Sequence, residues 1–175
     1  VFRATHSNRQ VAVLCPTTIL ADQHFETFKE RLSRFPLAAD RLTRLEKPRT
    51  QKQILQRVSQ GKTDIVIGTH RLLSKDVAFQ NLGLLIIDEE QRFGVKQKEH
   101  VRKFKEGVDT LSLSATPIPR TLHFALSGLR PMSVITTPPK NRISPKTFVL
   151  PFGKKTIQNA IDTELERGGQ IYFLS

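Results

Sequence analysis

The sequence lacks several features that would point to whole classes of protein. Cys15 is its single cysteine among 175 residues, which excludes an internal disulfide and favours a reducing compartment, so we expect a cytoplasmic location. No apolar run approaches the ~20 residues that a membrane-spanning helix needs, so we expect no membrane partner. No internal repeat or low-complexity tract is apparent.

Acidic residues are scarce relative to basic ones. The chain has 16 Asp and Glu against 28 Lys and Arg, a formal charge of +12. A solvated surface accounts for any single Lys or Arg, but the summed positive field favours a nucleic-acid partner over a merely soluble basic protein. A metal-binding role for His70 is disfavoured, because no Cys or second His lies at ligand spacing from it.

The most informative feature present is an apolar run, 84–87, that leads directly into Asp88, Glu89, Glu90 and Gln91. A short, wholly apolar run predicts a strand buried on both faces of a parallel sheet. Carboxylates at its carboxyl end project into the crevice where such sheets bind ligands. There Asp88 can hold Mg²⁺ against the phosphates of a nucleotide, and Glu89 can polarise a water molecule. The alternative is a strand that ends in solvated acids.

Three other short runs end in small, hydroxylated or charged residues, and helical stretches separate them. Hydroxyl groups at a strand's end can hydrogen-bond to a neighbouring carboxylate or phosphate. The alternation predicts an α/β fold, a parallel sheet flanked by helices, whose strand ends meet at one edge. The run at 11–15 leads into Pro16-Thr17-Thr18. The run at 64–67 leads into Gly68-Thr69-His70-Arg71, and the run at 110–113 leads into Ser114-Ala115-Thr116.

In this order and approximate spacing, the four segments resemble those of the superfamily 2 helicases and translocases. The finer match lies in residues 88–95 and 114–122, which resemble two families of bacterial double-stranded DNA translocases, the transcription-repair coupling factors and the RecG-type fork-remodelling helicases. RecG enzymes usually carry Gln-His after the first two acids and Leu-Thr-Gly before the second motif. This chain has Glu90-Gln91 and Arg-Leu-Thr-Arg-Leu at 41–45, so both departures favour the coupling factors. The resemblance covers nearly the whole chain.

The resemblance implies a RecA-like motor of the P-loop NTPase superfamily that uses ATP and Mg²⁺ to move on double-stranded DNA. The full protein would displace a stalled RNA polymerase and recruit nucleotide-excision-repair proteins through regions outside this chain. The implied roles are catalysis for Asp88 (the Mg²⁺ ligand), Glu89, Glu90 and Gln91, coupling for Ser114, Ala115 and Thr116, and DNA contact for Pro16, Thr17, Thr18, Gly68, Thr69, His70 and Arg71.

Several alternatives stay open. A RecG-type branch-migrating helicase is the main enzymatic one, and a catalytically inert DNA- or protein-binding module is another. Without the resemblance, Thr17 or Thr18 is equally well explained as a helix cap. Arg92 and Arg120 could pair with the motif carboxylates or with DNA.

A complete motor needs a phosphate-binding loop of the form G-x-x-x-x-G-K-[ST]. Gly61-Lys62-Thr63 has Gln56 in the first glycine position and follows a helical stretch, so we interpret Gly61 as a helix end. Gly153-Lys154-Lys155-Thr156 has Phe148 in that position. We therefore expect the chain to begin downstream of its loop, with residues 1–5 as the tail of the following helix, and to hydrolyse no ATP alone.

The Pro-rich basic stretch at 137–142 is the expected domain boundary. It predicts a partial RecA-like domain at 1–136, a linker at 137–146 and the start of a second RecA-like domain at 147–175. Helical spacing predicts an apolar face on each side of the boundary, and 171–174 is typical of a fresh strand. The two faces are Phe25, Phe28, Leu32 and Phe35, and Ile157, Ala160, Ile161 and Leu165.

Overall fold

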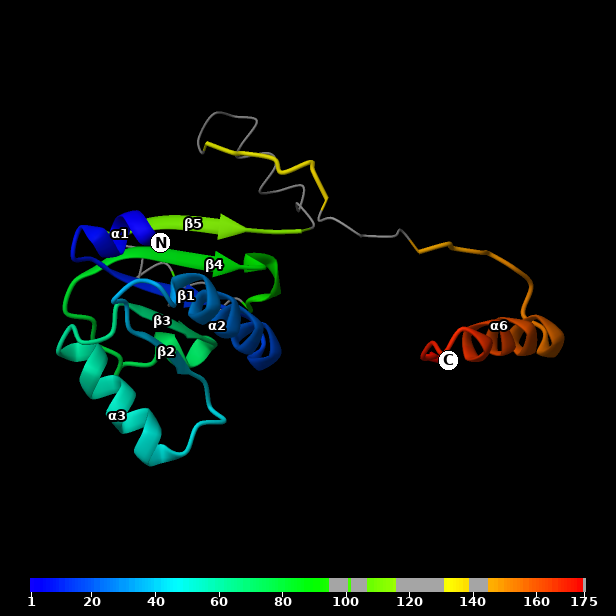
Figure 1. The fold of residues 1–175 in the computed structure, drawn as a ribbon, viewed down its shortest axis with the longest axis horizontal. Coiled ribbons are helices and arrows are strands. Elements are labelled where there is room, and N and C mark those ends of the chain that lie inside the picture. The colour runs from blue at the N-terminus through cyan, green and yellow to red at the C-terminus, as the bar shows by residue number, and fades with distance from the viewer. Residues whose placement is uncertain (95–100, 102–106, 116–130, 139–144, 175) are drawn as a thin grey trace. The chain divides into compact units, whose positions relative to one another are not determined.

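The computed structural model describes residues 1–94, 101, 107–115, 131–138 and 145–174 (Figure 1). The chain divides into two units, Val1–Pro131 and Met132–Ser175. The expected organisation into 1–136, 137–146 and 147–175 stays a prediction. No helix among the described residues is long and apolar enough to cross a membrane.

The first unit is built on a five-stranded sheet with the strand order β2-β3-β1-β4-β5. Every neighbouring pair is parallel, so the predicted α/β fold with a parallel sheet flanked by helices is confirmed (Figure 1). The strands are β1 (Gln10–Leu14), β2 (Ala39–Leu42), β3 (Ile65–Gly68), β4 (Leu82–Asp88) and β5 (Asp109–Leu113), and the helical segments are α1 (Phe2–His6), α2 (Thr18–Leu32), α3 (Pro48–Ser59), η1 (His70–Leu73) and η2 (Glu90–Arg92).

The central strands are buried on both faces, which is why their sequences are apolar without alternation. Val11 and Val13 of β1 pack with Ala21, Phe25 and other residues of α2 on one face. The alternate residues of β1 face the other side and pack with residues of α3 and η1. Side chains that alternate in direction along a strand thus supply two separate cores.

Helix α2 begins at a threonine cap and ends earlier than its apolar pattern suggests. Thr17 has an extended backbone, and its Oγ1 accepts a hydrogen bond of 3.3 Å from Leu20 N. Phe25, Phe28 and Leu32 pack on the sheet as predicted. Phe35 does not share their helix, because α2 ends at Leu32. Its ring lies 4.7 Å from that of Phe2 and is 44% exposed.

Gly61 ends α3, as the sequence predicted. Its backbone has φ +69°, and its N–H donates to Val58 O over 3.1 Å. The left-handed conformation favours glycine and stops the helix. Thr63 is buried, and its hydroxyl donates to Asp40 over 2.6 Å. Gly61-Lys62-Thr63 therefore connects a helix to a strand and is not a phosphate-binding loop.

The second unit contains one helix among its described residues, α6 (Lys154–Glu166). Its predicted apolar face is present, and the chain after it turns at Gly168, where φ is +74°. The strand predicted at 171–174 is wrong for the described chain. These residues are exposed and lie outside any sheet, because a strand needs a partner and none of the described residues in this unit provides one.

Candidate functional site

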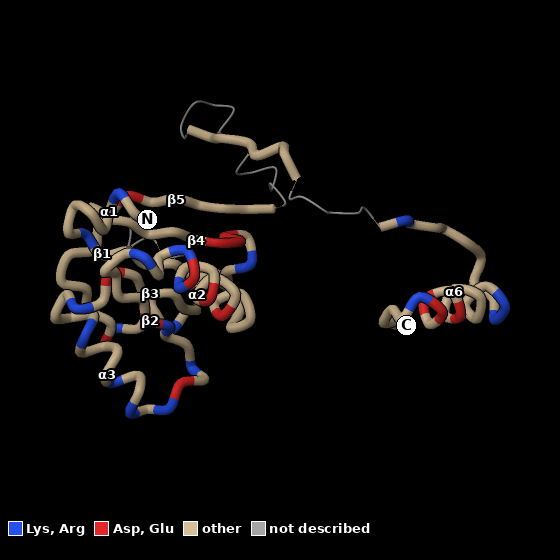
Figure 2. Tube along the Cα trace, in the orientation of Figure 1, with Lys and Arg blue, Asp and Glu red and all other residues tan. Residues whose placement is uncertain are grey.

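The predicted segments meet at the carboxyl edge of the sheet, because β1, β3, β4 and β5 run parallel and each segment begins where its strand ends. Figure 2 shows the acidic segment directly after β4. Thr116 and Arg120 lie outside the described residues. The structure thus brings together Pro16-Thr17-Thr18, Gly68-Thr69-His70-Arg71, Asp88-Glu89-Glu90-Gln91 and Ser114-Ala115.

Asp88 is the last residue of β4 and contacts a histidine from α2. Its Oδ2 lies 2.8 Å from Nε2 of His24, and its side chain is 16% exposed. Burial, and then the charge of Asp88, raises the pKa of the Cys15 thiol to about 12. Cys15 is therefore a protonated core residue, and the negative charge of Asp88 acts at the end of the neighbouring strand β1.

Sequence reasoning missed His24. The available signal was topological: His24 lies on the helix that follows β1, and β1 turned out to be the neighbour of β4. A helix that follows a strand packs back on the sheet beside that strand. A polar residue facing the sheet from such a helix reaches the end of an adjacent strand.

Glu89 occupies a left-handed backbone conformation, with φ 50° and ψ 49°. This is uncommon outside glycine and concentrates at functional sites. Its N–H donates to Leu113 O over 3.0 Å, which continues the pairing of β4 with β5. Its carboxylate accepts a hydrogen bond of 3.2 Å from Ala115 N and another from the amide of Gln91. The side chain is thus held toward the end of β5.

Glu90 provides another link between the acidic segment and β5. Its Oε2 accepts a hydrogen bond of 2.8 Å from the hydroxyl of Ser112. Glu89 N also donates to Leu113 O, and Ala115 N donates to the Glu89 carboxylate. These bonds join the segment expected to be catalytic to the segment expected to couple nucleotide and DNA. A displacement of the acidic segment after β4 would therefore move the segment after β5, and the reverse, through these hydrogen bonds.

The carboxylates suit Mg²⁺ better than a metal held by protein alone. No group of three or more His, Cys, Asp or Glu among the described residues could hold a metal ion. Mg²⁺ is commonly bound through one or two carboxylates and completes its shell with phosphate oxygens and water. Asp88, partly exposed at the carboxyl edge and oriented by His24, fits that pattern.

The segment after β3 is more buried than a contact surface requires. Gly68 is buried in the sheet, and Thr69 is only 3% exposed. Burial, and then the nearby charge of Arg44, lowers the pKa of His70, which favours a neutral imidazole. The side chain of His70 is half-buried and therefore reaches solvent. The structure shows no ion pair for it among the described residues.

Arg71 is engaged within the protein. Its guanidinium donates two hydrogen bonds, of 2.7 and 2.6 Å, to the carboxylate of Asp76 and a third, of 2.9 Å, to Gln51. The side chain of Arg71 is 14% exposed, whereas that of Asp76 is 54% exposed. The pairing holds the pKa of the Asp76 carboxyl below its ordinary value. Arg71 therefore brings little uncompensated charge to this edge.

The loop after β2 adds exposed residues that sequence reasoning did not assign. Arg44 is exposed and lies close enough to His70 to affect its pKa. Leu45 is 77% exposed, and Lys47 is exposed where α3 begins. A loop that follows an unrecognised strand could not be placed at this edge from the sequence.

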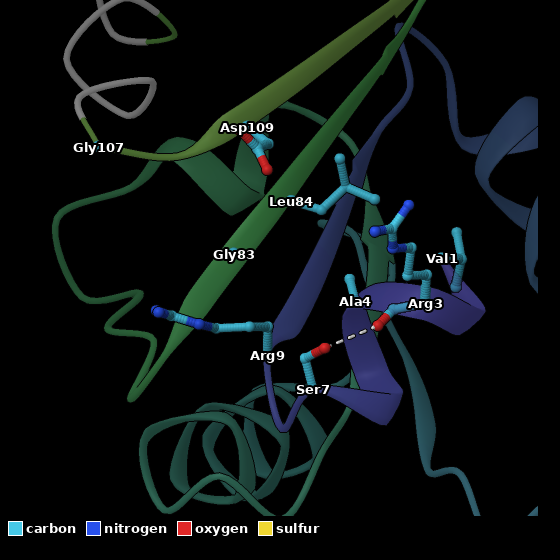
Figure 3. A pocket seen from close by; sticks show the side chains of 9 residues that line it. All are labelled: Val1, Arg3, Ala4, Ser7, Arg9, Gly83, Leu84, Gly107 and Asp109. Carbon is cyan, nitrogen blue, oxygen red and sulfur yellow. Dashed lines mark hydrogen bonds between the residues drawn. The ribbon is translucent and has the colours of Figure 1, made fainter.

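A hollow of about 410 Å³ lies at the opposite edge, at the amino ends of the strands (Figure 3). Its ionisable side chains are Arg3, Arg9 and Asp109, and Arg9 donates to Asn81 over 2.6 Å. Ser7 is bonded to the carbonyl of Arg3 over 3.2 Å (Figure 3). Arg9 and Ser7 thus serve local structure, and none of the described segments predicted to be functional lies here, so the carboxyl edge is the better candidate site.

Known proteins are similar to this chain in sequence and in fold. A family model described as DEAD/DEAH box helicase matches residues 1–124. The transcription-repair-coupling factors of Bacillus subtilis, Myxococcus xanthus and Escherichia coli are 52%, 50% and 49% identical over 173 residues, 99% of this chain. The chain spans about 15% of the length of these relatives. The solved structure of RecG bound to a three-way DNA junction superposes with a TM-score of 0.68 at 37% identity, covering 93% of this chain and 22% of that chain.

Proposed function

Because the chain belongs to the DEAD/DEAH box helicase family, we propose that it forms part of an ATP-driven translocase on double-stranded DNA, of the transcription-repair coupling type. The observation that carries the proposal is the identity of about one half to transcription-repair-coupling factors over nearly the whole chain. Since the chain spans about 15% of those relatives, the proposed activity is that of a longer protein, which would also supply a phosphate-binding loop.

The helicase family implies nucleotide binding, generally with Mg²⁺. Asp88 would hold the ion, which neutralises charge on the phosphates when bound. Glu89 would orient and polarise a water molecule with a carboxylate already fixed by Ala115 and Gln91. Gln91 and Glu90 would keep the segment in place, Gln91 through Glu89 and Glu90 through Ser112.

The segment Ser114-Ala115-Thr116 would couple the nucleotide to DNA. Ala115 N donates to Glu89, so a change at the acidic segment reaches the end of β5 without an intermediary. Hydrogen bonds that bridge two mobile segments are a physical route for such coupling, provided that the segments have two discrete arrangements.

DNA would lie along the carboxyl edge. Pro16, Thr17 and Thr18 open helix α2, whose first backbone N–H groups favour phosphate oxygens. Gly68 ends β3 beside them, and Thr69, His70 and Arg71 follow it. The formal charge of +12 favours the approach of a polyanion. Contacts of this kind hold the DNA backbone and carry no sequence information.

The partners of the longer protein would be a stalled RNA polymerase and nucleotide-excision-repair proteins, bound through regions outside this chain. A RecG-type helicase is the second candidate, favoured by the structural similarity to RecG. One experiment separates the two. The longer protein is incubated with ATP and either a polymerase stalled on linear duplex or a three-way DNA junction, and Glu89→Gln serves as the inactive control.

Polymerase release without junction processing supports the coupling function, and the converse supports the RecG-type function. Absence of both activities and of DNA-stimulated phosphate release contradicts the proposal that the chain serves a motor.

A further inference from the structure

His24, a residue to which the proposed function gives no role, contacts the candidate Mg²⁺ ligand. Its Nε2 lies 2.8 Å from Oδ2 of Asp88, and the two side chains are 30% and 16% exposed. A carboxylate accepts hydrogen bonds, so with Asp88 in its carboxylate form Nε2 of His24 is the donor of this pair. The bond fixes the direction in which Asp88 presents its carboxylate.

Helix α2, which carries His24, is held on the sheet by its apolar face and by an ion pair. Ala21 is fully buried, and Phe25 packs against the core. Arg41 of β2 donates to Asp22 over 2.7 Å and to Glu46 over 2.8 Å, and its guanidinium lies 6.0 Å from the centre of the Phe25 ring. The helix is thus attached to the loop after β2 through Arg41 and to the end of β4 through His24.

Glu46 keeps its charge in this arrangement. Burial alone would raise the pKa of its carboxyl, but hydrogen bonds from Thr43 and then from Arg41 lower it. The Thr43 hydroxyl and N–H donate to Glu46 over 2.7 and 2.6 Å. The ion pair of Arg41 with Glu46 therefore stays intact at neutral pH, and Arg41 links the loop to α2 by also donating to Asp22.

The same helix begins at the edge where DNA is proposed to bind. His24 follows the Thr17 cap by two turns, about 10 Å along the helix axis. A helix of this length moves as a rigid element, so a small shift at its first turn is carried to His24. No other described residue joins α2 to Asp88 by a hydrogen bond shown in the structure.

We propose that His24 is a positioning residue that orients Asp88 for Mg²⁺ and, through α2, makes Mg²⁺ binding at Asp88 sensitive to DNA at the carboxyl edge. The inference rests on the proposed function and adds to it a specific link between the two sites. Residues that orient a metal ligand through a hydrogen bond change metal affinity or activity by about 10- to 100-fold when replaced.

The test uses the longer protein with its phosphate-binding loop and three variants. His24→Leu removes the donor, His24→Gln supplies an amide N–H near the position of Nε2, and Gln23→Ala changes an exposed neighbour in α2 as a matched control. Binding of a fluorescent ATP analogue is titrated with Mg²⁺, with and without duplex DNA. DNA affinity without nucleotide and the melting temperature are measured in parallel.

In the wild type we expect DNA to lower the Mg²⁺ concentration needed for half-maximal binding of the analogue. By thermodynamic linkage, Mg²⁺ and nucleotide then raise DNA affinity by the same factor. His24→Leu should raise the Mg²⁺ midpoint about 10- to 100-fold and abolish the DNA effect, while DNA affinity without nucleotide is unchanged. His24→Gln should restore both properties, and Gln23→Ala should resemble the wild type.

The outcomes separate this inference from the proposed function. An unchanged midpoint and DNA effect in His24→Leu overturn the positioning role alone. The positioning role is also overturned if His24→Gln fails like His24→Leu and both lower the melting temperature, since His24 then acts in packing. A wild-type protein that binds neither the analogue nor DNA overturns the proposed function, and this inference with it.

Discussion

We predict that Gly68→Ala destabilises the first unit through a clash inside the sheet. A Cβ built on Gly68 lies 2.1 Å from the carbonyl oxygen of Leu42 and 3.1 Å from Cγ of Leu72. Gly68 pairs with Leu42 in the ladder between β3 and β2, so the conflict is with the backbone of an adjacent strand. An ordinary contact would require the two strands to separate by more than an ångström there.

Overpacking of a well-packed core typically costs about 1–3 kcal/mol, and a rigid backbone neighbour places this site toward the upper end. For a domain of this size each kcal/mol lowers the melting temperature by roughly 3–5 °C, so we expect a fall of roughly 5–15 °C. Thermal and urea unfolding followed by circular dichroism would measure the change. The urea m-value should stay the same if only stability changes.

Gly153→Ala is the matched control. Gly153 has an extended backbone, and an added Cβ would meet only Oγ1 of Thr156, at 3.7 Å. We expect little change in unfolding there. The contrary outcome is that Gly68→Ala unfolds like the wild type and binds DNA more weakly. That result would show that the close approach of β2 does not require glycine at position 68, and that the residue acts by direct contact with DNA.

Three further outcomes follow from the site. In the longer protein, Glu89→Gln should still bind ATP and DNA but release phosphate about 10²- to 10⁴-fold more slowly, and near-normal turnover would reassign the general base. Arg44→Ala should reduce the slope of log K against log salt for duplex binding by about 0.9, whereas Asp76→Asn should steepen it by releasing Arg71, as fluorescence anisotropy would show. The folded-state pKa of Glu46 is lowered, so its stabilising contribution is present above the ordinary carboxyl pKa of 4.5 and is lost as pH falls through the lower folded value. Calorimetry below pH 4.5 should show a shallower acid loss of stability in Glu46→Gln, and an identical acid limb would contradict this reasoning.

Strands with a wholly apolar sequence could be predicted because both of their faces are covered. The runs at 11–15, 64–67 and 84–87 became β1, β3 and β4, with a shift of one or two residues at each end. Strand β2 was missed, because two of its four residues are Asp40 and Arg41. Their charges are compensated by ion pairs with residues outside the strand, and sequence patterns do not reveal such partners.

The order of the acidic and hydroxyl segments revealed the site, but their contacts depend on which strands are neighbours. The bond from Ala115 to Glu89 exists because β5 lies beside β4, and the bond from His24 to Asp88 because β1 lies on the other side. Arg71 illustrates the opposite case. The resemblance implied a DNA contact for Arg71, whereas its charge is already paired with that of Asp76, five residues later.

The central place of β1 has a consequence for the order in which the protein can fold during synthesis. Strand β1 is made before both of its partners, β3 and β4, which end only at Gly68 and Asp88. At a synthesis rate of about 5–20 residues per second, the apolar strand spends roughly 4–15 s without both neighbours. The pairing of β1 on both sides therefore forms only after β4 has been made, and β5 joins the sheet later still. The residue that completes β4 is Asp88, so the second neighbour of β1 and the proposed metal ligand are made in the same step of chain growth.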